Sequence, residues 1–460
     1  MGFSDKIAQY KAWRTGVKHC TLDPEGPGVV RIHLVPPKFR IFGRAPYIAI
    51  LNGYYLLPIG YSWAMLLSAF MDEVNLYDGK VIDVDAERGI ATCTVDRVAR
   101  IYPSVGRDSI EEDLACLLDV VFKVARGRVD EVDGEIGRLS VRAYSRNMSA
   151  PHRMDLMISA MTDEAGAWKC NQRCVFCYAA GQSLGSCREL TAEEWKKAID
   201  KLRLAGVPML TFTGGEPTLR SDLCEIISYA KWFVTRLNTN GVCLTEELTN
   251  RLKAASLDSV QITLYSHSAE IHNSLVGCER HRETVKGIRN AVRAGLDVSV
   301  NTPLCALNSD YLKTLEFISS LGVRFVTVSG LICTGMAESA HGAHDLSEDQ
   351  LFCIVREAKQ YCDAHGMEMD FTSPGLIAAE KLESLRMNVP SCGAALSNMA
   401  IAPDGTVVPC QSWLKNGSGL GNILTDGWKV IWNHAKCRSL RAMSEEKALS
   451  CPFRNSDVDT

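Results

Sequence analysis

The sequence predicts an α/β protein built on a parallel sheet and preceded by a small α+β domain. From Arg153 onward, short apolar runs alternate with amphipathic segments in units of roughly 25 to 40 residues. Such repeated strand and helix units call for a parallel sheet that is either doubly wound or curled into a barrel. Before Arg153 the strands come first and the helices follow, which is typical of an α+β domain.

Composition excludes several protein classes. The 460 residues include 50 Lys plus Arg and 54 Asp plus Glu, giving a net charge of −4, and 46% of residues are hydrophobic. This is the composition of a folded protein of two or three domains, without the charge or low complexity of a disordered chain. No long basic run supports nucleic-acid binding. The 18 cysteines are too few for a small disulfide scaffold but need an explanation.

The opening segment and one uncharged stretch bear on location. Met1–Tyr10 lacks the apolar core of a secretory signal, so we expect the protein to be in the reducing cytoplasm. In that compartment, clustered cysteines bind metals or act in catalysis more often than they form disulfides. Ala45–Met71 has no charged residue and is long enough to span a bilayer. However, Asn52-Gly53 is a strong hairpin signal inside it, so we expect no membrane span.

The first domain, residues 1–128, is expected to hold three strands and three helices. The strands are Val29–Val35, Tyr47–Leu51 and Tyr54–Leu57. The first two helices are Ser62–Val74 and Thr94–Ile101. A capping box of Ser109 with Glu112 predicts the start of the third helix, which ends before Gly127. Residues 129–152 are polar and are expected to be a linker.

The second part of the chain carries clear strand and helix signals. The expected strands are Met209–Thr213, Val234–Asn238, Ser259–Leu264, Val298–Thr302 and Arg324–Ser329. Capping boxes at Thr191 with Glu194 and at Ser347 with Gln350 predict helix starts, and a further helix is expected over His281–Ala294. Beyond these helices follows a glycine-rich tail with four cysteines.

Three cysteines lie close together just before the helix that starts after Thr191. Cys170, Cys174 and Cys177 are spaced 4 and 3 positions apart, so one loop can direct all three thiolates at a soft metal centre. A structural zinc site normally has four ligands, whereas a four-iron cluster held by three cysteines keeps one iron open. From the residues alone, an iron–sulfur cluster, a zinc site and ordinary buried cysteines all remain open.

A second motif follows the strand Met209–Thr213. Gly214-Gly215-Glu216-Pro217 places two glycines at the carboxyl end of a parallel strand, where a ligand can approach the backbone closely. The alternative is a tight turn without a ligand.

The two motifs together resemble the radical S-adenosylmethionine (SAM) superfamily over roughly Arg153 to Pro374. The resemblance implies a partial (β/α)6 TIM-like barrel over residues 153–375. It also implies a [4Fe–4S] cluster that binds S-adenosylmethionine, cleaves it after one-electron reduction, and so yields a 5′-deoxyadenosyl radical that abstracts hydrogen from a substrate. A low-potential electron donor such as flavodoxin or ferredoxin is implied as a partner.

The resemblance assigns roles to individual residues and leaves the residue that acts on the substrate unidentified. It implies three cluster ligands, Cys170, Cys174 and Cys177. It implies that Gly214, Gly215 and Glu216, followed by Pro217, hold the methionine amine, and that Phe176 lies near the adenine. Asn240 and Thr263 are either ribose or carboxylate contacts or ordinary caps at strand ends.

The tail, residues 376–460, resembles the SPASM/twitch extension, which carries auxiliary clusters. It has four cysteines where full SPASM domains have seven, so one auxiliary [4Fe–4S] cluster is expected. The implied ligands are Cys392, Cys410 and Cys451, with Cys437 either a fourth ligand or a buried structural residue. The other cysteines of the chain are expected to be small core residues.

The first domain resembles the RiPP recognition element, a winged-helix-like domain that captures leader peptides by strand addition; the alternative is a capping domain. The resemblance therefore implies an enzyme that modifies a ribosomally synthesised precursor peptide. One alternative is a SPASM-type enzyme that matures a folded protein or acts in cofactor biosynthesis. Another is a non-catalytic peptide-binding protein whose cysteines hold zinc.

Overall fold

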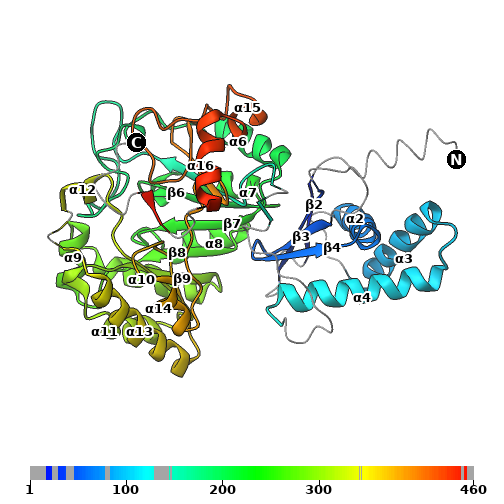
Figure 1. The fold of residues 1–460 in the computed structure, drawn as a ribbon, viewed down its shortest axis with the longest axis horizontal. Helices are drawn as coiled ribbons and strands as arrows, with labels where there is room; N and C mark the ends of the chain where they lie inside the picture. Colours follow the sequence, from blue (N-terminus) through cyan, green and yellow to red (C-terminus); the bar gives the residue numbers. More distant parts are fainter. Residues whose placement is uncertain are drawn as a thin grey trace. The chain divides into compact units, whose positions relative to one another are not determined.

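The computed structural model describes residues 17–22, 29–37, 46–77, 83–128, 144–145, 148–340, 342, 344–446 and 450–452. The chain forms two compact units (Figure 1). One consists mainly of the chain before Arg153, and the other of most of the chain after it.

The first unit is a four-stranded antiparallel sheet followed by three helices. The strands, β1 (Lys18–Leu22), β2 (Val30–Val35), β3 (Tyr47–Leu51) and β4 (Tyr55–Ile59), are paired in sequence order. The helices are α2 (Tyr61–Asn75), α3 (Val84–Ile101) and α4 (Arg107–Ala125). The β3–β4 turn passes through Asn52 and Gly53, both at positive φ, as the hairpin signal predicts. The expected order of strands before helices is confirmed.

Three details of this unit differ from expectation. Strand β1 was not expected. Helix α3 starts ten residues earlier than Thr94, because the Asp83 side chain accepts a hydrogen bond from the Ala86 N–H and caps it there. The capping box at Ser109 is wrong: α4 starts at Arg107, since Gly106 already supplies the extended backbone before the first turn.

The second unit is built on a parallel sheet. Its parallel strands are β5 (Arg153–Ser159), β6 (Met209–Gly214), β7 (Val234–Thr239), β8 (Ser259–Thr263), β9 (Asp297–Pro303), β10 (Phe325–Ser329) and β11 (Glu368–Phe371), in sequence order across the sheet. The helices between them are α6 (Ala192–Ala205), α7 (Leu223–Tyr229), α8 (Glu246–Ala254), α9 (Ala269–Val276), α10 (His281–Arg293), α11 (Tyr311–Ser320), α12 (Met336–Ala340) and α13 (Glu348–His365). The strands β5 to β10, each with a following helix, make the expected partial (β/α)6 barrel, and all five expected strands are present.

The capping boxes expected in this unit are confirmed. The Thr191 N–H donates to Glu194 Oε2 at 2.9 Å, and the Ser347 N–H donates to Gln350 Oε1 at 2.8 Å.

The tail adds to the same sheet. Strand β12 (Asn398–Ile401) is parallel to β5, and β13 (Val407–Val408) is antiparallel to β12. Three helices, α14 (Ala379–Ser384), α15 (Trp428–Trp432) and α16 (Ala435–Glu446), complete it. The tail strand between Cys392 and Cys410 therefore pairs directly with β5, the strand that leads into the Cys170–Cys177 loop.

Alternation along the strands separates two faces of the sheet. Residues such as Ile262 and Val300 are buried and apolar, whereas the positions between them carry polar groups. On the polar face Gln261 Nε2 donates to Thr327 Oγ1 at 2.9 Å, although β9 lies between their strands. The polar face is therefore the concave inner face of a curled sheet.

Within the described ranges, every helix is too short or too polar to cross a bilayer.

Candidate functional site

The three-cysteine loop runs between β5 and α6 and is fixed to the end of α9. The N–H groups of Arg173 and Val175 donate to the carbonyls of Val276 and Leu275, both at 2.9 Å. Gly277, with φ +68°, makes this approach possible, because a Cβ there would lie 2.5 Å from the Arg173 carbonyl oxygen. Backbone bonds thus set the shape of the loop before any metal binds.

The loop brings its three thiols together. Burial raises the pKa of Cys174, and the charges of Cys177 and Cys170 raise it further. Burial raises the pKa of Cys170 to about 12. A metal must therefore displace three protons, which soft iron centres do readily.

In the described part of the chain, no three His, Cys, Asp or Glu side chains form a group that could hold a single metal ion. A four-iron cluster places its ligands on different irons, and three half-buried thiols fit that donor set.

Gly214 and Gly215 pack so closely against the backbone at the end of strand β5 that neither position has room for a side chain. A Cβ on Gly214, at φ +134°, would lie 2.3 Å from the Ser159 oxygen, and one on Gly215 would lie 2.6 Å from the Ala160 oxygen. The Gly215 N–H donates to the Ser159 carbonyl at 2.8 Å. Backbone packing thus provides a reason for these glycines that differs from the expected approach of a ligand.

Glu216 is fully buried and its carboxylate is saturated by protein donors. Oε1 accepts from Thr239 Oγ1 at 2.6 Å and from the Thr218 N–H at 3.0 Å, and Oε2 accepts from the Asn240 N–H at 2.8 Å. Burial raises its pKa, and these hydrogen bonds oppose the rise. The side chain therefore clamps β6 to β7, while Pro217 starts the following 3-10 turn.

The remaining expected SAM contacts fall in different surroundings. Asn240 Nδ2 donates to Asn171 Oδ1 at 2.6 Å, and its own Oδ1 accepts from the Val242 N–H at 3.0 Å, so its amide caps the strand end and holds the cysteine loop. Thr263 is half-buried at the end of β8. Phe176 is buried beside Tyr265.

The tail brings three of its four cysteines together. Burial raises the pKa of Cys410 to about 12, with further contributions from the charges of Cys451 and Cys392. Cys437 is fully buried on α16, where Arg441 Nη1 donates to its sulfur at 3.7 Å.

A short segment after Cys177 joins the two cysteine groups. The buried Gln182 side chain donates from Nε2 to the carbonyls of Tyr178 and Ser412, and its Oε1 accepts from the Leu414 N–H at 3.1 Å. The Tyr178 hydroxyl donates to Gln411 Oε1 at 3.4 Å. Polar contacts therefore tie the loop that contains Cys410 to the loop that contains Cys177.

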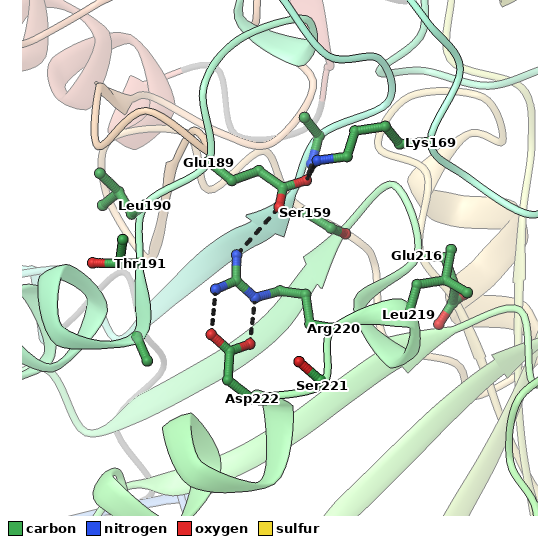
Figure 2. Close-up of a pocket in the computed structure, with 12 residues that line it drawn as sticks. Ser159, Lys169, Glu189, Leu190, Thr191, Glu216, Leu219, Arg220, Ser221 and Asp222 are labelled. Atoms are coloured by element: carbon green, nitrogen blue, oxygen red, sulfur yellow. Dashed lines mark hydrogen bonds and ion pairs between the residues drawn. The ribbon is translucent and has the colours of Figure 1, made fainter.

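A cavity of about 480 Å³ adjoins the Gly214–Pro217 segment (Figure 2). Its charged lining comes from Lys169, Glu189, Glu216, Arg220 and Asp222. Figure 2 shows Glu189 between Lys169 and Arg220.

Several residues at the site were missed by the sequence analysis. Asn171 has no signal beyond its place in the loop. Cys278 was expected in the core; it is half-buried beside the hydrophobic cluster that contains Phe176, and its sulfur also lies 3.8 Å from the Asn171 carbonyl oxygen. The expectation of a core position is wrong for Cys93, Cys116 and Cys353, which are exposed on helices because apolar neighbours in sequence need not share a helix face.

Comparison with known families and proteins fits this geometry. Residues 169–329 match the radical SAM superfamily, and residues 392–452 match an iron–sulfur cluster-binding domain, SPASM. The mycofactocin maturase of Mycolicibacterium smegmatis is 30% identical over 287 residues, covering 60% of this chain and 70% of that protein. The chain belongs to the radical SAM superfamily. As a radical SAM enzyme with a SPASM domain, it binds a [4Fe–4S] cluster and S-adenosylmethionine, and its SPASM domain binds iron–sulfur.

Two further relatives extend the comparison. The radical SAM enzyme is 28% identical over 301 residues to the AdoMet-dependent heme synthase of Methanosarcina barkeri, covering 61% of this chain and 85% of that protein. The fold of this chain is similar to that of Streptococcus suis SuiB bound to the precursor peptide SuiA. The TM-score is 0.58, with 13% identity, and the likeness covers 86% of this chain and 87% of that one.

Proposed function

We propose that this protein is a maturase that modifies a ribosomally synthesised precursor peptide, by a cross-link or another change at a side chain or α-carbon. The observation that carries the proposal is the extent of the likeness to SuiB. The likeness covers 86% of this chain, whereas residues 153–460 make up only about two thirds of the chain. The shared fold therefore includes much of the N-terminal unit. The maturase among the sequence relatives supports the same function.

The residues of the barrel divide the work of cofactor binding. Cys170, Cys174 and Cys177 hold the cluster, and the Gly214–Pro217 backbone holds the methionine end of S-adenosylmethionine. When bound and reduced, the cluster supplies the electron that cleaves S-adenosylmethionine to the radical that takes a substrate hydrogen. Glu216 and Asn240 keep the two loops in place through their bonds to β7 and to Asn171.

Cys392, Cys410 and Cys451 hold one auxiliary cluster, and Cys437 is structural. Two observations support this division. The charges of Cys451 and Cys392 raise the pKa of Cys410, so the three thiols are neighbours, whereas the Cys437 sulfur accepts a hydrogen bond from Arg441. A cluster with three protein thiolates keeps one iron open to a further ligand.

The N-terminal unit captures the precursor peptide. Strands β1 and β4 are the edges of its sheet, and an edge strand offers backbone groups to an added peptide strand. Flavodoxin or ferredoxin delivers the electron, and a reducing cytoplasm suits both the thiolate ligands and this donor.

The test uses the anaerobically reconstituted full-length protein and the peptide encoded by a short reading frame beside its gene. With dithionite and S-adenosylmethionine, we expect 5′-deoxyadenosine and a change in peptide mass detected by mass spectrometry. Formation of 5′-deoxyadenosine without any peptide change would count against the precursor peptide and leave the radical chemistry intact.

A second candidate is an enzyme of cofactor biosynthesis. The heme synthase relative supports it, because the match covers 85% of that protein. A porphyrin substrate modified at a rate that matches or exceeds that of the peptide would favour this candidate. The zinc-binding, non-catalytic alternative is set aside, since the chain belongs to a family of enzymes.

A further inference from the structure

Glu189 lies at the meeting point of three segments around the cavity of Figure 2. Its Oε1 accepts from Lys169 Nζ at 2.8 Å and from the Ala160 N–H at 2.9 Å. Its Oε2 lies 3.4 Å from Arg220 Nη1. The Glu189 side chain is only 19% exposed, so the three donors meet one carboxylate that is largely shielded from water.

Each donor belongs to a segment with a role at the site. Lys169 directly precedes Cys170, the first cysteine of the loop. Ala160 follows β5, and its carbonyl occupies the space that a Cβ on Gly215 would need. Arg220 follows the Gly214–Pro217 segment and is itself fixed.

Two sets of bonds hold Arg220. Its Nε and Nη2 donate to the two oxygens of Asp222 at 2.8 and 2.7 Å. Its Nη1 donates to the Ile158 carbonyl of β5 at 2.8 Å. A guanidinium fixed in this way gives Glu189 a rigid partner on the S-adenosylmethionine side of the site.

We propose that Glu189 is a positioning residue that holds the cysteine loop in register with the Gly214–Pro217 segment, so that the two motifs are placed to bind the cluster and S-adenosylmethionine together. The proposal rests on the assignment of both motifs to the cofactors and is independent of the peptide substrate. Small displacements of reacting groups have large effects on rate, so a shared anchor between the two motifs has a direct effect on catalysis.

The chemistry of the contacts requires a carboxylate. All three partners are donors, and an ionised carboxylate has acceptors on both oxygens. A glutamine has one acceptor oxygen, and whichever way its amide turns, its NH₂ group faces a cation or an N–H. Replacement of Glu189 by glutamine therefore keeps the volume and breaks part of the anchor.

The experiment compares Glu189→Gln with Glu193→Gln in the cluster-loaded, full-length protein. Glu193 is a matched control because it also pairs with a lysine, Lys196, but its side chain is 74% exposed and lies on the surface of α6. For each protein we would measure iron content, the dissociation constant for S-adenosylmethionine, and the change in the electron paramagnetic resonance spectrum of the reduced cluster when S-adenosylmethionine is added.

We expect Glu189→Gln to keep its iron but to raise the dissociation constant about tenfold or more, with a smaller spectral change than wild type. Glu193→Gln should match the wild type in all three measurements. An unchanged dissociation constant and an unchanged spectrum in Glu189→Gln overturn the proposal. Loss of cluster iron in parallel with loss of S-adenosylmethionine binding also overturns it, because Glu189 would then act in retaining the cluster.

A second pair of variants covers the case in which Glu189→Gln does not fold. Lys169 is 42% exposed, so Lys169→Met removes the arm to the cysteine loop with little effect on packing. It should weaken S-adenosylmethionine binding and reduce the spectral change, and Lys169→Arg should restore both. Wild-type behaviour of Lys169→Met overturns the proposal.

Discussion

The side-chain amides of Asn171 and Asn240 are joined by a hydrogen bond of 2.6 Å between Asn240 Nδ2 and Asn171 Oδ1. Asn171 belongs to the cysteine loop and Asn240 follows β7, so this bond joins two loops that adjoin different strands of the barrel. Asn171→Ala should raise the KM for S-adenosylmethionine about fivefold with cluster iron unchanged, because one internal hydrogen bond contributes about 1 kcal/mol. The exposed variant Asn433→Ala, on a surface helix end, is the control. An unaltered KM in Asn171→Ala would show that the bond does not shape the site.

Removal of one proposed cluster ligand should remove the chemistry. Cys174→Ala leaves two thiols in the loop, so we expect no 5′-deoxyadenosine with dithionite and S-adenosylmethionine and a loss of one cluster's iron. Cys116→Ala, at an exposed thiol of α4, should behave as wild type. Continued 5′-deoxyadenosine formation by Cys174→Ala would refute the ligand assignment.

Replacement of Cys410 and replacement of Cys437, both in the tail, should have different effects on iron content. Cys410→Ala should lower the iron content by one cluster while the first cluster still responds to S-adenosylmethionine. Cys437→Ala should keep the iron of the wild type and lose only packing beside Arg441, lowering the free energy of unfolding by about 1 kcal/mol. Equal iron loss in the two variants would make Cys437 a fourth ligand.

A methyl group at Gly214 should be destabilising for two reasons. Gly214→Ala combines a backbone at φ +134° with a Cβ 2.3 Å from the Ser159 oxygen, and we expect a loss of about 2 to 4 kcal/mol in the free energy of unfolding by urea. Gly166→Ala isolates the first effect, because Gly166 has φ +83° and no neighbour within 4 Å of the added Cβ. It should cost about 1 kcal/mol. Equal losses in the two variants would remove the steric argument.

His272 should make stability depend on pH. It is fully buried on α9, where Nδ1 accepts from the Tyr265 N–H, and burial followed by the nearby charge of His281 lowers its pKa to about 4. Its pKa in the unfolded chain is about 6.5, so the unfolded state takes up the proton first as the pH falls. Stability should thus be complete above pH 6.5 and decline by about 3 kcal/mol toward pH 4.

The measurement is urea unfolding of the anaerobic protein at pH 7.5 and pH 5. In His272→Asn the amide oxygen replaces Nδ1 as acceptor and does not titrate, so the loss of stability between the two pH values should be smaller than in wild type. The same loss in both proteins would exclude His272 as its source.

Local signals in the sequence predict most of the barrel but only part of the first unit. Alternating apolar positions and capping residues such as Thr191 specify strands and helices from nearby residues alone, and these were found. Helix α4 shows the opposite case: Ser109 and Glu112 satisfy the pattern of a capping box, yet Gly106 sets the helix start three residues earlier. A pattern of side chains cannot predict which of two nearby starts the backbone adopts.

The candidate site shows the same division. The spacing of Cys170, Cys174 and Cys177 is a local property and predicts a cluster loop. The contacts around that loop come from distant residues: Cys278 lies beside Asn171, and Gln182 reaches Ser412, 230 positions later in the chain. Such pairs depend on how strands are ordered in the sheet, and no periodicity in a single sequence encodes them.

The bonds of Gln182 have a consequence for electron flow. One buried amide fastens the segment after Cys177 to the segment after Cys410, so hydrogen bonds hold the two cysteine groups at a set separation. Electron tunnelling rates fall steeply with distance. A fixed separation would therefore keep the rate of any electron transfer between two bound clusters constant from one turnover to the next.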